Sequence, residues 1–411
     1  MQALRALVGS GLAAIALAAP AAAAATARLV VTPADSLIDA PVSIHASGLP
    51  AGKRVTITAQ TVDAYGTSWL GRATLRADAA GRVDPVRERS LSGTYNGRDG
   101  MGLFWSMLPI GWHGRTDVLG MPPAPVATVR FTVSVSGRTL ARAAIVRRAW
   151  LPEVSVRDLT LERDGLIGHF CWAPSLALRP AIVRIGGSDG GLPGTTTCSL
   201  LASHGYPTLA LAYFGVPGLP PELTNIPLEY FQHALQWLGR QPGVNPSKLV
   251  MMGVSRGGEG ALLVASVYPE LVHATVGYVP NAYVWPGYPD YMQPAWTLNG
   301  RPVPHVTFDG PPTEAQTIKV ERIAGPIFVV GAGLDELWRS ATYVVQIAER
   351  LRTHGRTDFT ALTYKSAGHG IGGALPFLRS ATLSLGGTPA ADARARDDSW
   401  PKLLAFLRRL E

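Results

Sequence analysis

A short glycine-flanked serine motif is the part of this sequence best suited to chemistry. Residues 253–257 read Gly-Val-Ser-Arg-Gly, a G-x-S-x-G pattern centred on Ser255, with a strand-like run before it and helical periodicity after it. In such a unit the serine takes a strained backbone conformation, glycines allow close chain approach, and helix N–H groups point toward developing negative charge. The pattern predicts Ser255 as a nucleophile; its alternative is an ordinary strand-to-helix turn of a Gly-rich chain.

An acid and a histidine follow Ser255 in the chain order that such a nucleophile needs. Asp335 comes after a strand-like run at 327–330, and His369 lies in a loop between two glycines. We expect His369 to take the proton of Ser255 and pass it to the leaving group, while Asp335 holds the imidazole and stabilises its cation. Glu336 is a neighbouring alternative to Asp335.

An oxyanion hole would require two further donors. We expect one to be the backbone N–H of Arg256, directly after the nucleophile, and the other the backbone N–H of Ser188 in the loop at 186–191. The same glycine-rich loop could be read as a phosphate cradle, but it lacks the G-x-x-x-x-G-K-S/T spacing and any lysine. We therefore reject the phosphate-cradle interpretation and predict a serine hydrolase site.

Two differently patterned regions must position these residues. Residues 26–150 carry short alternating segments separated by turns, which predicts an antiparallel β-sandwich. Residues 151–411 alternate strand-like and helical runs, which predicts an α/β-hydrolase domain with a mostly parallel sheet. We also expect Ser399 to be the N-cap of a final helix at 400–410. The segment 278–317, rich in Pro, Tyr and Trp, either shapes the acyl pocket or a lid, or is a surface loop that packs on the sheet.

The first 25 residues have the pattern of a signal peptide. Arg5 precedes an apolar run, and small residues at 23–25 fit a cleavage site, so we expect an exported, periplasmic or extracellular protein. Export would permit a disulfide between Cys171 and Cys198, but two buried free thiols fit the sequence equally well.

Composition limits the other classes of partner. The net charge is +8, with 37 Lys and Arg against 29 Asp and Glu, but the basic residues are scattered. A nucleic-acid partner, which requires a clustered patch, is therefore not expected. No stretch after the leader has the ~18 apolar residues of a membrane-spanning helix. No metal or cofactor is expected, and the oligomeric state stays open.

Several separate stretches, in order, resemble the acyl-CoA thioesterase / bile acid-CoA:amino acid N-acyltransferase family, which belongs to the α/β-hydrolase superfamily. The acid loop 335–340 and the histidine dipeptide 368–369 are similar to that family's catalytic loops. Further similar stretches lie at 92–95, 100–107, 199–203, 210–213, 228–231, 386–389 and 398–401.

The resemblance implies an Ig-like sandwich before the hydrolase domain, and a Ser/Cys–His–Asp triad acting on a small-molecule acyl (thio)ester. Family members that transfer acyl groups to amino acids tend to use Cys and those that hydrolyse use Ser, so Ser255 favours a thioesterase. The alternatives are an N-acyltransferase, an exported carboxylesterase acting on a non-CoA ester, and a non-enzymatic exported protein. Export favours the second alternative, because familiar members are intracellular, and Asp189 would repel CoA phosphates if it faced the entrance.

Overall fold

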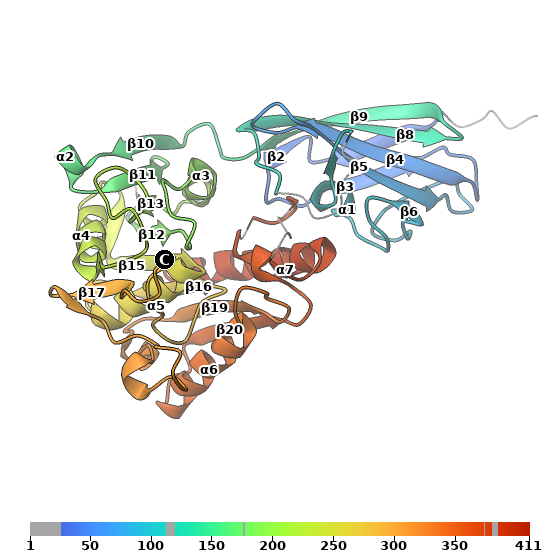
Figure 1. Ribbon diagram of the computed structural model, residues 1–411. Coiled ribbons are helices and arrows are strands. Elements are labelled where there is room, and N and C mark those ends of the chain that lie inside the picture. The colour runs from blue at the N-terminus through green and yellow to red at the C-terminus, as the bar shows by residue number, and fades with distance from the viewer. Residues whose placement is uncertain (1–25, 112–119, 176, 374, 380–384) are drawn as a thin grey trace, which may run out of the picture.

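The computed structural model describes residues 26–111, 120–175, 177–373, 375–379 and 385–411. The expected signal peptide, residues 1–25, lies outside them. Two parts are visible in Figure 1: a β-rich part at the N-terminal end and a mixed α/β part that follows it. The chain passes from one to the other between β9, which ends at Arg148, and β10, which begins at Ser155.

The N-terminal part is a sandwich of a seven-stranded and a two-stranded sheet. Alternate residues of β4 point inward, and Val55, Ile57 and Ala59 are fully buried, as expected for strands with one face on a core. Antiparallel pairing predominates, and the exception is the parallel pair β2–β9. The larger sheet has the order β2 (Asp35–Leu37), β9 (Arg138–Arg148), β8 (Val126–Val135), β4 (Arg54–Val62), β5 (Ser68–Arg76), β6 (Ser92–Gly93), with β7 (Leu108–Pro109) also on β5; the smaller pairs β1 (Arg28–Thr32) with β3 (Ser43–Ser47), and helix α1 spans Gly102–Trp105.

The second part contains an eight-stranded sheet, parallel from β13 to β20, with two antiparallel strands at one edge. All residues of the central strand β16 are buried, which is typical of a parallel sheet covered on both faces. The predicted α/β-hydrolase architecture is therefore confirmed. The strand order is β10 (Ser155–Leu159), β11 (Ile167–Trp172), β13 (Thr208–Ala212), β12 (Arg179–Ile185), β15 (Val244–Val254), β16 (Ala274–Tyr278), β19 (Ile327–Ala332), β20 (Phe359–Tyr364).

Helices cover both faces of this sheet (Figure 1). Side chains of α4 (Leu228–Gly239), α5 (Arg256–Val267) and α6 (Ser340–Thr353) share one core with one face. Side chains of α3 (Thr195–Ser203) and α7 (Pro389–Arg408) share another core with the opposite face. Smaller elements are α2 (Leu161–Asp164), a three-stranded sheet of β14 (Ile226–Pro227), β17 (Trp296–Leu298) and β18 (Arg301–Pro302), and the 3₁₀ turns η1 (Glu314–Gln316), η2 (Val320–Arg322) and η3 (His369–Gly373).

The prediction that Ser399 caps the final helix is wrong. Helix α7 begins eleven residues earlier, where the Thr388 side chain accepts a hydrogen bond from Ala391 N at 3.2 Å and Pro389 occupies the first turn. Ser399 is fully buried within the helix, and Pro401 lies inside the helix without ending it. The Ser-x-Pro pattern at 399–401 therefore does not always mark the start of a helix. It is compatible with a helix interior when the residues before and after it are held by tertiary packing.

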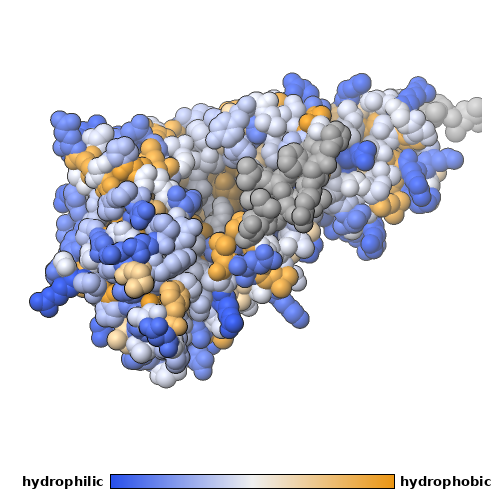
Figure 2. Space-filling view, viewed as in Figure 1, coloured by the Kyte–Doolittle hydropathy of each residue, from blue (hydrophilic) through white to orange (hydrophobic). Residues whose placement is uncertain are grey.

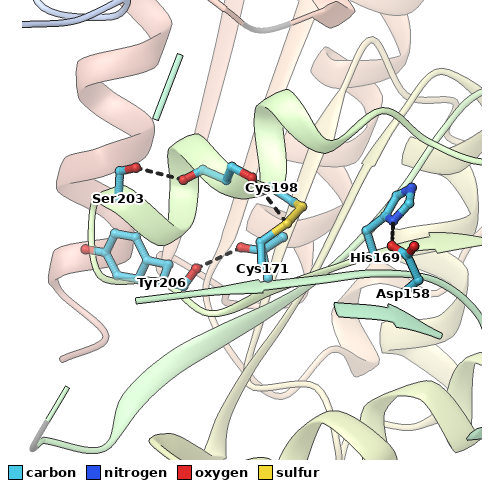
Figure 3. The surroundings of a disulfide bond; sticks show 8 residues. Asp158, His169, Cys171, Cys198, Ser203 and Tyr206 are labelled. Carbon is cyan, nitrogen blue, oxygen red and sulfur yellow. Dashed lines mark hydrogen bonds and ion pairs between the residues drawn. A yellow bond between two sulfur atoms is a disulfide. The ribbon is translucent and has the colours of Figure 1, made fainter. Parts of the chain in front are cut away.

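Cys171 and Cys198 form a disulfide, which decides between the two alternatives left by the sequence. The bond joins β11 to α3, with 5.7 Å between the Cα atoms (Figure 3). Helix α3 follows the glycine-rich loop at 186–191, so the disulfide fixes the helix that follows this loop to strand β11, next to the edge strand β10.

The two parts of the molecule are joined by polar and apolar contacts. Asp39 of the sandwich accepts hydrogen bonds from His204 Nε2 at 2.6 Å and Trp400 Nε1 at 2.7 Å. Phe377, from the second part, packs into the core of the sandwich. Figure 2 shows a mostly hydrophilic surface that is hollowed where the two parts meet.

Candidate active site

Ser255 occupies a sharp turn between β15 and α5. Its backbone has φ 57° and ψ −123°, a positive-φ conformation that non-glycine residues rarely adopt. A Cβ added to Gly253 would lie 1.9 Å from the carbonyl oxygen of Gly257, and one added to Gly257 would lie 2.0 Å from that of Gly186. The two glycines of the motif are thus required by close backbone contacts, and the turn presents Ser255 at the carboxyl end of the sheet.

His369 and Asp335 lie together although 34 residues separate them. His369 Nδ1 is 2.8 Å from Asp335 Oδ2, and both side chains are almost entirely buried. The neighbouring Glu336 makes no hydrogen bond to His369 within the described residues. Asp335, rather than Glu336, is therefore the carboxylate that contacts the imidazole, and it does so at Nδ1.

Asp335 is itself held by three donors of its own loop. Its Oδ1 accepts hydrogen bonds from the backbone N–H groups of Leu337 and Trp338 at 3.0 and 3.2 Å. Its Oδ2 accepts one from Ser340 Oγ at 2.5 Å, in addition to the contact with His369. These bonds fix the carboxylate without supplying a competing cation.

Ser255 and His369 line one pocket with a volume of about 420 Å³. Within the described residues there is no hydrogen bond between Ser255 Oγ and His369, and such catalytic bonds are often long before substrate binds. The sandwich contributes part of the wall, so the pocket lies where the two parts meet. The pocket is lined by Gly120, Met121, Pro123, Gly187, Ser188, Asp189, Val254, Ser255, Leu337, His369, Gly370, Gly372, Gly373, Leu375, Leu378, Arg379, Leu385 and Arg396.

Of the two predicted oxyanion donors, Arg256 directly follows Ser255 in the chain and Ser188 lines the same pocket as Ser255. Arg256 is the first residue of α5, where backbone N–H groups have no acceptor within the helix. A Cβ added to Gly187 would lie 3.1 Å from Ser255 Cβ, and Ser188 lines the pocket next to it. The hydroxyl of Tyr213 donates to the carbonyl oxygens of Gly186 and Gly187 at 3.0 and 3.2 Å, and so holds the loop from beneath.

The Arg256 side chain points into a buried cluster. Its Nη2 donates to the carbonyls of Trp285 and Pro286, and its Nε lies 3.4 Å from Glu259 Oε2. Glu259 Oε1 accepts from the indole of Trp296 and from Trp285 N. Burial raises the pKa of Glu259, while the Arg256 charge opposes that shift. This cluster ties segment 278–317 to α5, and none of the described residues that line the pocket belongs to this segment.

Three residues of the site were not found from the sequence. Ser340, Tyr213 and Glu259 each act on a partner that the fold brings close. Ser340 lies a few residues after Asp335, and Glu259 a few residues after Ser255. A polar residue at such a short spacing from a candidate catalytic residue is a signal that could have identified both. Tyr213 carries no such signal, because its contacts with 186–187 depend on the neighbouring strands β12 and β13.

A search of the described residues for metal sites finds no group of three or more His, Cys, Asp or Glu arranged to hold an ion. In the same ranges, no helix has both the length and the apolar character to cross a bilayer.

The known proteins to which this chain is similar include both thioesterases and acyltransferases. Mouse "Acyl-coenzyme A thioesterase 6" is 31% identical over 93% of this chain and 96% of its own. Human "Bile acid-CoA:amino acid N-acyltransferase" is 30% identical over 93% of this chain and 97% of its own. A solved α/β hydrolase from a deep-sea metagenome library is 19% identical, with a TM-score of 0.43, over 63% of this chain and 98% of that one.

Two family descriptions match along the chain. Residues 39–161 match "Acyl-CoA thioester hydrolase/BAAT N-terminal region", and residues 226–410 match "BAAT / Acyl-CoA thioester hydrolase C terminal". These matches agree with the resemblance of the acid and histidine loops. The chain therefore belongs to the acyl-CoA thioesterase / bile acid-CoA:amino acid N-acyltransferase family.

Proposed function

We propose that this enzyme hydrolyses acyl thioesters through an acyl-serine intermediate on Ser255. The observation that carries the proposal is the His369–Asp335 pair, which borders the same pocket as a serine in a strained strand-to-helix turn. This arrangement supplies a nucleophile, a base and an orienting carboxylate, with backbone donors beside them. Family membership supports thioester chemistry of this kind.

The proposed reaction has two halves. Ser255 Oγ attacks the thioester carbonyl carbon while His369 Nε2 takes its proton, and the N–H groups of Arg256 and Ser188 stabilise the oxyanion. Collapse breaks the C–S bond, and the thiolate leaves with the proton from His369. A water molecule, deprotonated by His369, then attacks the acyl-serine, and the carboxylic acid is released as Ser255 regains its proton.

Hydrolysis is favoured over transfer to an amine because Ser255 would form an oxygen ester, which activated water cleaves. The N-acyltransferase activity of relatives remains the second candidate, and the family membership supports it. A plain ester with a leaving group other than CoA is the third. The specific observation for this last candidate is Asp189, an exposed carboxylate at the pocket, which would repel CoA phosphates there.

The decisive experiment follows thiol release from a panel of acyl-CoA thioesters and plain esters, with the Ser255→Ala variant as the control. Loss of a triad nucleophile lowers kcat by roughly 10⁶ in a well-studied protease, so we expect the variant to be inactive. Wild-type activity in Ser255→Ala would refute the mechanism. Adding glycine or taurine and searching for the amide by mass spectrometry separates transfer from hydrolysis.

We further propose that the protein is exported and matures in an oxidising compartment. The leader pattern motivates this proposal, and the Cys171–Cys198 disulfide supports it, because such bonds are rare in reducing cytosol. We expect the purified protein to resist thiol alkylation until it is reduced. Reduction should remove about 2–4 kcal/mol of stability, measured by urea unfolding. Two freely alkylated cysteines in the native protein would argue against export into an oxidising compartment.

A further inference from the structure

A tryptophan of the acid loop contacts two members of the proposed triad. The backbone N–H of Trp338 donates to Asp335 Oδ1 at 3.2 Å. Its ring lies against the imidazole of His369, with 5.9 Å between the ring centroids and 71° between the ring planes. Rings packed in this edge-to-face manner restrict the orientation of each other. Trp338 therefore contacts the base of the site as well as the acid beside it.

The indole of Trp338 is fastened to the end of strand β16. Its Nε1 donates to the carbonyl of Val279 at 3.0 Å. Val279 directly follows β16, and the carbonyl of the preceding residue, Tyr278, accepts the backbone N–H of Ser255 at 2.9 Å. Two successive carbonyls at one strand end thus hold the turn of the nucleophile and the loop of the acid.

Val279 also lies against the turn that carries the histidine. The turn η3 begins at His369, and a Cβ added to its Gly372 would lie 3.1 Å from Val279 Cγ2. Val279 is fully buried and has φ 44°, which is rare for a β-branched residue. Its own N–H donates to the carbonyl of Val330 in β19 at 2.6 Å. Strained backbone of this kind persists only where surrounding contacts determine it, and it is typical of functional sites.

The three proposed catalytic side chains need such a junction because they belong to separate segments. The turn of Ser255 follows β15, the loop of Asp335 follows β19, and the turn of His369 follows β20. The sheet fixes the strand ends, whereas the positions of the segments beyond them depend on contacts between those segments. A displacement of about 1 Å at a reacting group can lower a rate by ~10²-fold.

We propose that Trp338 is a positioning residue that fixes the separation between Ser255 and His369. Its indole bond to Val279 joins the half of the site that holds the nucleophile to the half that holds the base. The proposal rests on the proposed hydrolase function and deepens it. Trp338 is not among the described residues that line the pocket, so its effect passes through Asp335 and His369 and not through contact with substrate.

The test begins with Trp338→Phe, which keeps an aromatic ring beside His369 and removes the indole N–H. We expect kcat for a simple ester or thioester to fall about tenfold or more, with KM nearly unchanged because the pocket lining is intact. Labelling of Ser255 by a fluorophosphonate should slow by a similar factor. In that reaction Oγ displaces fluoride from phosphorus and the serine proton passes to His369, so its rate reports the alignment of nucleophile and base.

The matched control is Trp69→Phe in the sandwich. The indole Nε1 of this buried residue donates to Asp63 at 2.8 Å, and neither residue belongs to the described lining of the pocket. The substitution therefore removes the same kind of hydrogen bond at a distance from the site. We expect this variant to lose stability in urea unfolding while it keeps its kcat and its labelling rate.

A second variant, Val279→Gly, tests the same link from its other side. Glycine adopts φ 44° without strain, so the carbonyl that receives the indole is no longer constrained, and the contact with η3 is lost. We expect kcat to fall at least as far as in Trp338→Phe.

Two results would overturn the inference. One is that either site variant, folded by circular dichroism, keeps the kcat and labelling rate of the wild type, and the other is that Trp69→Phe loses as much of both. A wild type that hydrolyses no ester or thioester and is not labelled at Ser255 would instead refute the proposed function.

Discussion

At the scale of single residues, the acid of the site is the most heavily supported group. Asp335 Oδ2 accepts hydrogen bonds from both His369 and Ser340, at 2.8 and 2.5 Å. Ser340 is fully buried and its hydroxyl also accepts from Ala332 N, so it bridges strand β19 to the acid loop. The residue acts on His369 only through Asp335, which makes it a positioning residue.

We expect Ser340→Ala to lower kcat about tenfold or more while leaving KM nearly unchanged. A hydrogen bond to a charged group contributes about 1.5–3 kcal/mol, and its loss frees Asp335 to leave the geometry that orients His369. Steady-state kinetics on an acyl thioester would measure the effect. Ser266→Ala is the matched control, because among the described residues the hydroxyl of this buried serine of α5 bonds only back to Leu263 O. Equal losses of kcat in both variants would remove the positioning role.

At the scale of elements, the oxyanion loop depends on the strand beside it. Tyr213 follows β13, and its hydroxyl holds two successive carbonyls of the loop at 186–187 from a fully buried position. Burial raises the pKa of this phenol, so it remains a neutral donor. The loop N–H groups are therefore positioned before substrate binds, which is what electrostatic stabilisation of an oxyanion requires.

Tyr213→Phe should therefore reduce kcat by about tenfold, since one misplaced oxyanion donor costs up to ~10²–10³ when it is lost entirely. Tyr230→Phe is the matched control: its hydroxyl donates to Ala212 O and accepts from Ile167 N, away from the loop. We expect that control to lose stability but to keep its kcat. An unchanged kcat in folded Tyr213→Phe would show that the loop holds its shape without this bond.

The elements also explain what the sequence could and could not predict. The strand-to-helix turn at the G-x-S-x-G motif can be predicted from the sequence. Its two glycines are required by backbone contacts within a few residues and with one adjacent loop. The hydrogen bonds that Tyr213 donates to the loop at 186–187 cannot be predicted from the sequence, because the order of the strands in the sheet decides which distant residues come into contact. The start of α7 was misplaced since Ser399 and Pro401 imitate a helix start, while the real cap, Thr388, precedes a polar stretch with no clear apolar period.

At the scale of the whole molecule, the sandwich forms part of the wall of the candidate active site. Met121 and Pro123 border the pocket, and Met121 N donates to the carbonyl of Arg379 at 3.1 Å. Helix α7 touches both parts, since its residue Trp400 bonds to Asp39 of the sandwich and Arg396 reaches the pocket. A change that disturbs this interface is thus expected to alter both the stability of the protein and the shape of the pocket.

A carboxyl group of α7 with a raised pKa lies near this interface. Burial, and next the charge of Asp99 in the sandwich, raise the pKa of Asp397 to about 7, against the pull of Arg396. An unfolded aspartate has a pKa near ~3.9. Between these values the folded state binds more protons than the unfolded state, so the free energy of unfolding falls as pH rises. The stabilising contribution is complete below about pH 4 and is lost as pH rises through about 7.

We therefore expect Asp397→Asn to be more stable than the wild type at pH 8, by at least about 1 kcal/mol, and close to it at pH 5. Urea unfolding at several pH values would measure the difference, in which contributions from unchanged groups cancel. Asp398→Asn is the matched neighbour: hydrogen bonds from Lys402 and Tyr364 lower the pKa of Asp398, so its charge is favoured and the substitution should slightly destabilise at pH 8. A wild-type advantage over Asp397→Asn that grows from pH 5 to pH 8 would mean that the ionised Asp397 stabilises the interface.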